Sequence, residues 1–330
     1  MKILIVGFGS IGRRHFRNLI SLGVDDILFY RSRMSTLSTD ELNGYIVETE
    51  LEAALAHQPD AVIISNPTAL HLDVAIPAAR AGCHLFIEKP ISHNLKGIDE
   101  LTNALAFGGG AVYIGYQFRH HPGLKLAKAK LDAGEIGTPI FMRAHWGEYL
   151  PNWHPWEDYR RSYSARAELG GGVILTLSHP IDYMRWMFGE VSEVCALTTD
   201  SNSLELDVED VAEIGLRFAS GSIGSIHLNY LQQPASHNLE IVGTLGTIQW
   251  DNANGETHII VPGKTETEWK IYEPPKGFER NHLFVAQMEH FLEVVSGSAS
   301  SQCTLQDGIG ALKIALAAHE SQQQGTTIKP

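Results

Sequence analysis

The sequence predicts an α/β fold in two parts: a doubly wound parallel sheet, followed by an α+β domain with a large, mainly antiparallel open sheet. Over residues 1–118 short β-branched runs alternate with longer helical patterns, which is typical of βαβ units. A glycine-rich turn follows the first of these runs. From Val191 to Tyr272 strand-like runs are joined by hairpin signals, which indicates an antiparallel sheet.

The composition excludes several classes of protein. A chain of 330 residues is longer than the ~250–300 residues at which single cores stop growing, so we expect two domains. Hydrophobic residues make up 44% and charged residues 19%, as in ordinary globular proteins. The formal net charge of −13 and the lack of a basic run argue against a nucleic-acid partner. The three cysteines (Cys83, Cys195 and Cys303) are widely spaced, which suits a reducing compartment.

The first domain, residues 1–118, is expected to alternate strands with helices. One helix covers Ile11–Leu22 and is capped by Gly23, and another covers Leu70–Ala81 and stops at Gly82. The predicted strands are Lys2–Val6, Ile27–Tyr30, Ala61–Ser65, His84–Glu88 and Ala111–Tyr116.

The second domain, residues 119–330, is expected to bind substrate and to form oligomers. Its predicted elements are a helix over Leu124–Ala133, a strand over Ile140–Tyr149, a helix opened by Gly170-Gly171-Gly172, a hairpin-rich sheet over Val191–Tyr272, and helices near Asn281–Val295 and Leu305–His319. The strand-like run from Lys2 leaves no room for a signal peptide, and no apolar stretch approaches the ~18–20 residues of a membrane span. We therefore expect a cytoplasmic protein without a membrane partner.

The turn Gly7-Phe8-Gly9-Ser10-Ile11-Gly12 follows the first strand and opens the first helix, as in the Rossmann dinucleotide-binding fold. Gly7 permits a tight turn, Gly9 lets the backbone approach a pyrophosphate, and Gly12 lets helix and strand pack closely. The N–H groups at the helix start suit phosphate oxygens. Arg13 and Arg14 oppose the helix dipole, so they are either solvated or hold an anion.

The end of the second strand bears on the choice of cofactor. NAD enzymes place an Asp or Glu there to bind the ribose 2′-hydroxyl, whereas this sequence reads Arg31-Ser32-Arg33. These side chains can hold a 2′-phosphate by charge-assisted hydrogen bonds, or they are solvated loop residues. The pattern favours NADP(H), with NAD(H) as the alternative.

Several motifs occur in the right order for a known family. They are the glycine turn, the segment from Asn66-Pro67-Thr68 to His71, Glu88-Lys89-Pro90, and Gly170-Gly171-Gly172 leading to His179-Pro180-Ile181-Asp182. Together they resemble the glucose-fructose oxidoreductase / inositol dehydrogenase / rhizopine catabolism (Gfo/Idh/MocA) family over nearly the whole chain. The resemblance implies a nicotinamide-dependent oxidoreductase of carbohydrate metabolism, active on sugars, sugar nucleotides or cyclitols, that forms a homodimer or homotetramer through an exposed sheet face.

The resemblance also implies roles for particular residues. Lys89 would contact substrate and nicotinamide and move the proton, and His179 would be the catalytic or substrate-orienting histidine. Gln117 and Arg119 match a family segment that binds cofactor and substrate. Asn66, Pro67 and His71 match the stretch that lines the nicotinamide ribose, and Glu88 matches the acid beside it. Ser65 is the remaining implied cofactor residue.

The sequence departs from the family at position 176, where many members carry an Asp. Thr176 and His179 are three residues apart, so we expect them on one helix face. A threonine can bind a substrate hydroxyl but is no base, which leaves Lys89 and His179 for the proton chemistry. Pro180 disfavours helical dihedrals at His179, so a kink is expected there.

An aromatic loop follows the strand at Ile140–Tyr149. Trp153, Tyr159 and Arg160 are the predicted substrate contacts in it, because aromatic faces suit sugar rings and an arginine suits a phosphate or carboxylate. An oligomer contact is the alternative. His120, His121 and His154 lack the acidic spacing of a zinc site, and no catalytic metal is expected.

Two other functions stay open at this point. One is a catalytically silent NAD(P)-binding sensor or assembly protein, for which the missing Asp at position 176 is the argument. The other is an enzyme that holds NAD tightly and oxidises its substrate only transiently during a hydrolase-like cycle.

Overall fold

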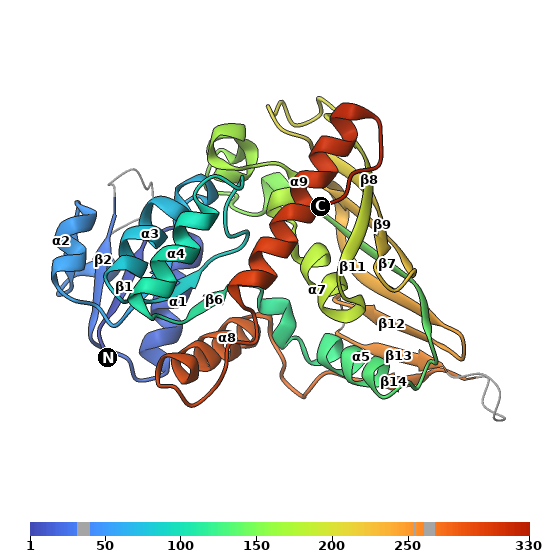
Figure 1. The fold of residues 1–330 in the computed structure, drawn as a ribbon, viewed down its shortest axis with the longest axis horizontal. Helices are drawn as coiled ribbons and strands as arrows, with labels where there is room; N and C mark the ends of the chain where they lie inside the picture. Colours follow the sequence, from blue (N-terminus) through green and yellow to red (C-terminus); the bar gives the residue numbers. More distant parts are fainter. Residues whose placement is uncertain (32–39, 254, 261–267) are drawn as a thin grey trace. The chain divides into compact units, whose positions relative to one another are not determined.

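The computed structural model describes residues 1–31, 40–253, 255–260 and 268–330. The chain forms two compact units, of which the first contains Met1–Gln117 and Arg280–Ile309, and the second contains Phe118–Glu279 and Gly310–Pro330 (Figure 1). The chain thus leaves the first unit next to the expected boundary at residue 118. Residues 280–309, however, return to the first unit, and the expected division into 1–118 and 119–330 does not include that return.

The first unit is built on a six-stranded parallel sheet in the order β3-β2-β1-β4-β5-β6. Its strands are β1 (Ile3–Val6), β2 (Ile27–Tyr30), β3 (Ile46–Glu48), β4 (Ala61–Ile64), β5 (His84–Ile87) and β6 (Val112–Ile114). The sheet confirms the predicted parallel architecture. β3 was not predicted, because its three residues are short of a recognisable strand pattern and Ile46 and Val47 are exposed.

Helices cover both faces of this sheet. Right-handed crossovers run in opposite directions from β1 to β2 and from β4 to β5, so α1 (Ser10–Ser21) and α3 (His71–Arg80) lie on opposite faces. α4 (Ile98–Gly108) packs beside α3, and α8 (Arg280–Val295) packs beside α1 (Figure 1). The unit also contains α2 (Leu51–Ala56) and two 3₁₀ turns, η1 (Asp40–Leu42) and η2 (Thr68–Leu70).

The second unit is built on an eight-stranded sheet in the order β14-β13-β12-β11-β7-β10-β9-β8. Its strands are β7 (Pro139–Tyr149), β8 (Val191–Thr199), β9 (Val211–Phe218), β10 (Ile223–Asn229), β11 (Leu231–Gly243), β12 (Thr247–Asp251), β13 (Thr257–Ile260) and β14 (Lys270–Tyr272). All neighbours are antiparallel except β7 and β10, which run parallel. The prediction of a large, mainly antiparallel sheet is confirmed.

Helices of the second unit pack on its sheet. α5 (Pro122–Asp132) lies against β12 and β13, and α7 (His179–Phe188) lies against β7 and β10 (Figure 1). α6 (Val173–Thr176) contacts β9 and β10. α9 (Leu305–Gln324) begins in the first unit and continues in the second. Short 3₁₀ turns are η3 (Gln117–His120), η4 (Leu150–Asn152), η5 (Tyr159–Arg161), η6 (Tyr163–Ala165) and η7 (Ala167–Leu169).

Candidate functional site

The glycine turn after β1 has the geometry that a pyrophosphate requires. Gly7 adopts φ +83°, which only glycine adopts readily. A Cβ on Gly12 would lie 2.2 Å from the Gly7 carbonyl oxygen, so helix α1 and the turn pack too closely for any side chain. A Cβ on Gly9 would meet no heavy atom within 4 Å. The backbone at Gly9 is therefore open to a ligand, and the helix start beside it offers N–H groups.

Neighbouring residues hold this turn in place. The Ser65 hydroxyl, at the end of β4, donates to the Val6 carbonyl oxygen at 2.8 Å. Phe8 is buried and packs edge-on against Phe16 and Phe29. The Phe8 side chain is thus part of the core, so only the backbone of this residue is available to a cofactor. Ser10 and Ile11 form the first turn of α1.

Arg13 and Arg14, near the start of α1, both contact other side chains of the protein. Arg13 donates to the Glu41 carboxylate at 2.7 Å and lies over the Phe8 ring. Arg14 lies over the Phe284 ring, and burial, together with the charge of Arg280, lowers its pKa. Protein partners therefore explain these two cations without a bound phosphate.

Arg31 lies directly after β2, and its main-chain N–H donates to the Glu48 carbonyl oxygen at 3.1 Å. Its Nε atom is buried and has no hydrogen-bond partner among the residues that the structure describes. Ser32 and Arg33, the other residues predicted to hold a 2′-phosphate, lie outside the described residues.

The carboxyl ends of β4 and β5 carry the other predicted cofactor residues. Asn66 follows β4, and its side-chain amide donates to the Leu70 carbonyl oxygen at 3.2 Å. Pro67 is the N-cap residue of η2. Glu88 is buried after β5, and one of its carboxylate oxygens accepts from the Lys89 main-chain N–H at 3.3 Å. Lys89 itself is half-buried.

His71 was predicted to line the cofactor ribose. It is the first residue of α3 and is buried, with Nδ1 3.0 Å from the Pro90 carbonyl oxygen and Nε2 3.0 Å from the Asn66 carbonyl oxygen. Both ring nitrogens therefore face main-chain oxygens of the two turns that carry Asn66 and Lys89. Burial lowers the pKa of the imidazole, against the opposing effects of these carbonyl contacts and of Glu88.

In the second unit the expectation that Thr176 and His179 share one helix face is wrong. α6 ends at Thr176 and α7 begins at His179, so Leu177 and Ser178 separate two short helices. Pro180 explains the break, because it has no N–H to donate to the Thr176 carbonyl oxygen, whereas a proline is tolerated in the first turn of a new helix. The expected interruption at His179 is thus confirmed as a helix start.

Thr176 is buried and interacts with Tyr230. The Tyr230 hydroxyl donates to the Gly172 carbonyl oxygen at 2.9 Å. Burial raises the pKa of this phenol far above its usual value, while a hydrogen bond with Thr176 opposes the shift. The Glu209 carboxylate lies where a Cβ on Gly172 would meet it, and it accepts from the Ile174 N–H at 3.1 Å. Burial raises the pKa of Glu209. Thr176, which stands where many family members carry an Asp, is therefore part of a buried polar cluster in this protein.

His179 is buried against aromatic rings. Its ring centroid lies 4.9 Å from that of Phe118 and 5.5 Å from that of Trp146. Trp146 in turn stacks on His237, with centroids 4.3 Å apart and the rings nearly parallel. The sequence interpretation missed Phe118, His237 and Tyr230, because no local motif marks a residue that reaches a site only through packing in the folded unit.

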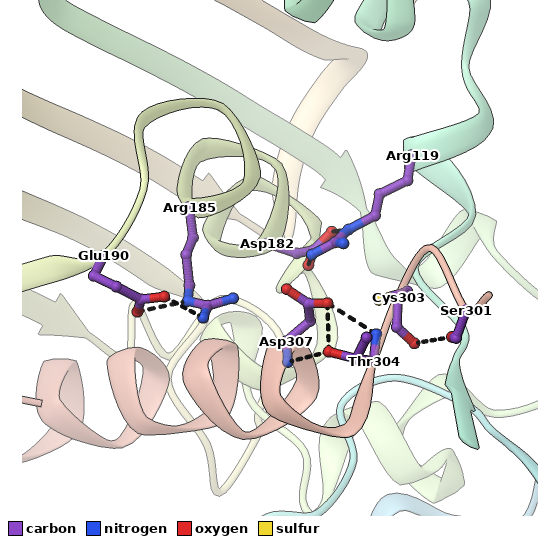
Figure 2. A network of polar contacts seen from close by, with 8 residues as sticks. All are labelled: Arg119, Asp182, Arg185, Glu190, Ser301, Cys303, Thr304 and Asp307. Carbon is purple, nitrogen blue, oxygen red and sulfur yellow. Dashed lines mark hydrogen bonds and ion pairs between the residues drawn. The ribbon is translucent and has the colours of Figure 1, made fainter. Parts of the chain in front are cut away.

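Arg119, a predicted substrate contact, is bound by a protein carboxylate. Its Nε and Nη2 donate to the two oxygens of Asp182 at 2.9 and 2.7 Å, and both side chains are buried. Figure 2 shows the Arg119 side chain meeting Asp182 on α7, one turn after His179. Gln117 is buried at the end of the first unit. Substrate contacts by Arg119 and Gln117 stay predictions.

The aromatic loop also pairs internally. Trp153 packs edge-on against Tyr230, and its indole Nε1 is buried without a hydrogen-bond partner among the described residues. Tyr159 donates to the Leu204 carbonyl oxygen at 3.1 Å. Arg160 pairs with Asp158 at 3.0 Å and with Glu205 at 2.9 Å. Tyr159 and Arg160 thus use their polar groups within the protein, whereas the indole N–H of Trp153 has no hydrogen-bond partner among the described residues.

Over the described ranges, no three histidine, cysteine or acidic side chains gather as metal ligands do. In the same part of the chain no helix is both long enough and apolar enough to cross a bilayer.

Two family models match the chain. Residues 1–116 match the model described as "Oxidoreductase family, NAD-binding Rossmann fold", and residues 124–249 match the "GFO/IDH/MocA C-terminal domain". The chain belongs to the Gfo/Idh/MocA family. This confirms the family predicted from the motifs, and the NAD-binding Rossmann fold of the first unit.

Relatives within the Gfo/Idh/MocA family span the whole chain. An uncharacterized oxidoreductase, YrbE of Bacillus subtilis, is 29% identical over 98% of this chain and 95% of its own length. The myo-inositol 2-dehydrogenase of Thermotoga maritima is 26% identical over 100% of this chain and 98% of its own. The fold is also that of a levoglucosan dehydrogenase solved with NADH and levoglucosan, with TM-score 0.89 and 19% identity over 100% of this chain and 99% of that one.

Proposed function

We propose that this protein transfers a hydride between NAD(P)H and a carbinol or carbonyl carbon of a sugar, sugar nucleotide or cyclitol. The observation that carries the proposal is the carboxyl edge of the first sheet. The glycine turn follows β1 and Lys89 follows β5, with only β4 between these strands. Ligands of open parallel sheets bind at this edge. Relatives named myo-inositol 2-dehydrogenase and scyllo-inositol 2-dehydrogenase (NAD(+)) support the substrate class.

The residues present fit a dinucleotide. The open backbone at Gly9 and the start of α1 suit the pyrophosphate, and the first turn of α1 contains no acidic residue that would repel it. Ser65, Asn66 and Pro67 follow β4, next to the glycine turn, where they would line the nicotinamide ribose. Glu88 and Lys89 follow the next strand.

The bound nicotinamide would supply or take up the hydride. Lys89 would hold the substrate oxygen by a hydrogen bond from its ammonium group. When a carbonyl is reduced, its carbon gains the hydride and its oxygen takes a proton from Lys89; in the oxidation Lys89 accepts that proton. The orienting role of His179, and substrate contacts by Trp153, Tyr159, Arg160 and Thr176, remain part of this proposal.

Replacement of Lys89 by methionine tests the function. We expect the unmutated protein to turn over sugars, sugar acids, sugar nucleotides or inositols. The absorbance of reduced nicotinamide measures this turnover. Lys89→Met should lower kcat about 10²- to 10⁴-fold, the effect of losing a general acid or base, with little change in cofactor Kd. Near-normal turnover in the variant would remove Lys89 from the mechanism. If the protein bound cofactor but turned over no compound, a catalytically silent NAD(P)-binding sensor or assembly protein would be favoured. If the cofactor stayed bound to the protein through gel filtration, an enzyme that oxidises its substrate only transiently would be favoured.

We further propose that NADPH binds more tightly than NADH, because Arg31 offers an unused buried donor and no carboxylate follows β2. Each charge-assisted hydrogen bond to a 2′-phosphate is worth about 1.5–3 kcal/mol, which is roughly tenfold to a hundredfold in affinity. Fluorescence titration should show this preference, and Arg31→Asp combined with Arg33→Ala should erase it. Equal or tighter binding of NADH to the unmutated protein would contradict the proposal.

The quaternary structure is also a proposal. We expect a homodimer or homotetramer, which light scattering on the purified protein would measure.

A further inference from the structure

Strand β5 ends at Ile87, two residues before Lys89. The segment Glu88-Lys89-Pro90 follows as a turn. Two buried histidines from different helices, His15 of α1 and His71 of α3, contact this turn on the two sides of Lys89.

His15 contacts the residue before Lys89. Its Nε2 lies 2.6 Å from a Glu88 carboxylate oxygen, and its side chain is fully buried. Because a carboxylate only accepts, Nε2 is the donor. The ring is packed edge-on between Phe86 and Phe284, with centroids at 5.0 and 6.3 Å. The other Glu88 oxygen accepts from the Lys89 N–H. His15 is thus linked through one carboxylate to the backbone of Lys89.

His71 contacts the residue after Lys89. Its Nδ1 lies 3.0 Å from the Pro90 carbonyl oxygen, and its Nε2 lies 3.0 Å from the Asn66 carbonyl oxygen. Carbonyl oxygens only accept and a neutral imidazole has one N–H, so the ring donates to one of these oxygens and lies in contact with the other. The imidazole thus lies between the turn that carries Lys89 and the turn that carries Asn66. Pro90 leads into Ile91, which is fully buried, so this side of the turn is anchored as well.

We propose that His15 and His71 are positioning residues for Lys89, and that they hold the backbone on both sides of it where the ammonium group meets the substrate. The proposal rests on the proposed function. It gives a different role to His71, which faces main-chain oxygens instead of a ligand, and it adds His15, which no motif singled out. A displacement of about 1 Å in a catalytic group can cost about 10²-fold in rate, so the effect should appear in kcat.

The chemistry of the two contacts allows matched variants. A glutamine amide nitrogen reaches the place of Nε2, and an asparagine amide nitrogen reaches the place of Nδ1. His15→Gln keeps the donor to Glu88, whereas His15→Leu removes it. His71→Asn keeps the contact with Pro90 and loses that with Asn66, whereas His71→Gln does the reverse.

The expected results differ within each pair. His15→Leu and His71→Gln should lower kcat roughly tenfold to a hundredfold, with cofactor Kd within about threefold of the unmutated protein. His15→Gln should restore kcat. His71→Asn should weaken cofactor binding through the Asn66 turn and keep most of kcat at saturating cofactor.

Hydrogen–deuterium exchange gives a readout that needs no substrate. Peptides that cover residues 86–92 of the full-length protein should exchange faster in His15→Leu and His71→Gln than in His15→Gln and His71→Asn. Equal exchange in all four variants would overturn the proposal, as would equal kcat losses in His71→Asn and His71→Gln. If the unmutated protein turned over no sugar, the proposed function would fail, and the exchange data and cofactor titrations would still decide whether these histidines hold the turn.

Discussion

Three of the arginines that suggest ligand contacts in the sequence are bound by protein carboxylates in the structure. Arg119 is held by Asp182, Arg160 by Asp158 and Glu205, and Arg13 by Glu41. A buried cation needs such a partner, because removing it from water costs several kcal/mol unless the charge is compensated. Of these pairs only Arg119–Asp182 is fully buried, so only this one should matter greatly for stability.

Replacement of Arg119 measures that contribution. Arg119→Met leaves the Asp182 carboxylate buried without its cation, which should destabilise the second unit by about 3–5 kcal/mol. All six tryptophans lie in the second unit, so their fluorescence during urea unfolding reports on it alone. Arg217→Met is the matched control, since it breaks an exposed pair with Glu193 that should be worth less than about 1 kcal/mol. Equal effects of the two substitutions would show that the buried pair has no special weight.

At the scale of elements, the sequence correctly predicts the strands and helices that a local residue pattern marks. β2 was predicted to the residue, and β1, β4, β5 and α5 within two residues at each end, because β-branched runs and glycine caps mark them. The break between α6 and α7 was only half predicted: Pro180 signals an interruption but does not say how many residues leave the helix. α2 and β3 escaped prediction because short, exposed elements depend on their neighbours.

The candidate site follows the same rule. The glycine turn, Asn66, Glu88 and Lys89 come from contiguous motifs, and the structure brings them to one sheet edge. Phe118 contacts His179 and His237, and Tyr230 contacts Thr176, only through packing in the second unit, and no local spacing encodes those contacts.

The start of α5 gives a prediction for pH. His121 is the N-cap residue, and its Nδ1 accepts from the Gly123 N–H at 3.1 Å. Burial lowers the pKa of His121 from 6.5 to about 4. Between these values the unfolded chain binds a proton that the folded protein does not, so this stability is present above the unfolded pKa and is lost as pH falls towards the folded one. The loss should be roughly 3 kcal/mol in total, at about 1.4 kcal/mol per pH unit.

His121→Asn isolates this effect. Asparagine keeps an oxygen acceptor at the N-cap and does not titrate in this range. The urea midpoint from tryptophan fluorescence should therefore fall less with decreasing pH in the variant than in the unmutated protein, while all other titrating groups remain common to both. Parallel pH profiles would mean that His121 is not held neutral.

At the scale of the whole molecule, the chain returns to its first unit after completing most of the second. α8 supplies Phe284 and Phe291, which are buried. Phe291 packs edge-on against Phe86 of β5, and its ring centroid lies 6.5 Å from that of Tyr113 of β6. The Ile114 N–H also donates to the Cys303 carbonyl oxygen at 3.0 Å. A helical pattern near the end of a sequence does not indicate which hydrophobic core the helix packs into. The sequence could therefore not predict that residues 280–309 belong to the first unit.

Truncation tests this composition of the first unit. Residues 1–118 alone lose two buried phenylalanines, each worth about 1.5–3 kcal/mol, from a unit whose total stability should be about 5–15 kcal/mol. We expect this fragment to melt without a cooperative transition in circular dichroism and to bind no NADPH. Residues 1–117 joined by a flexible Gly/Ser linker to 280–309 should melt cooperatively and bind NADPH. Because neither fragment contains tryptophan, nicotinamide fluorescence reports binding without interference. If residues 1–118 folded and bound NADPH as well as the linked chain, the domain would end at residue 118, and α8 would be an accessory to a core that is already complete.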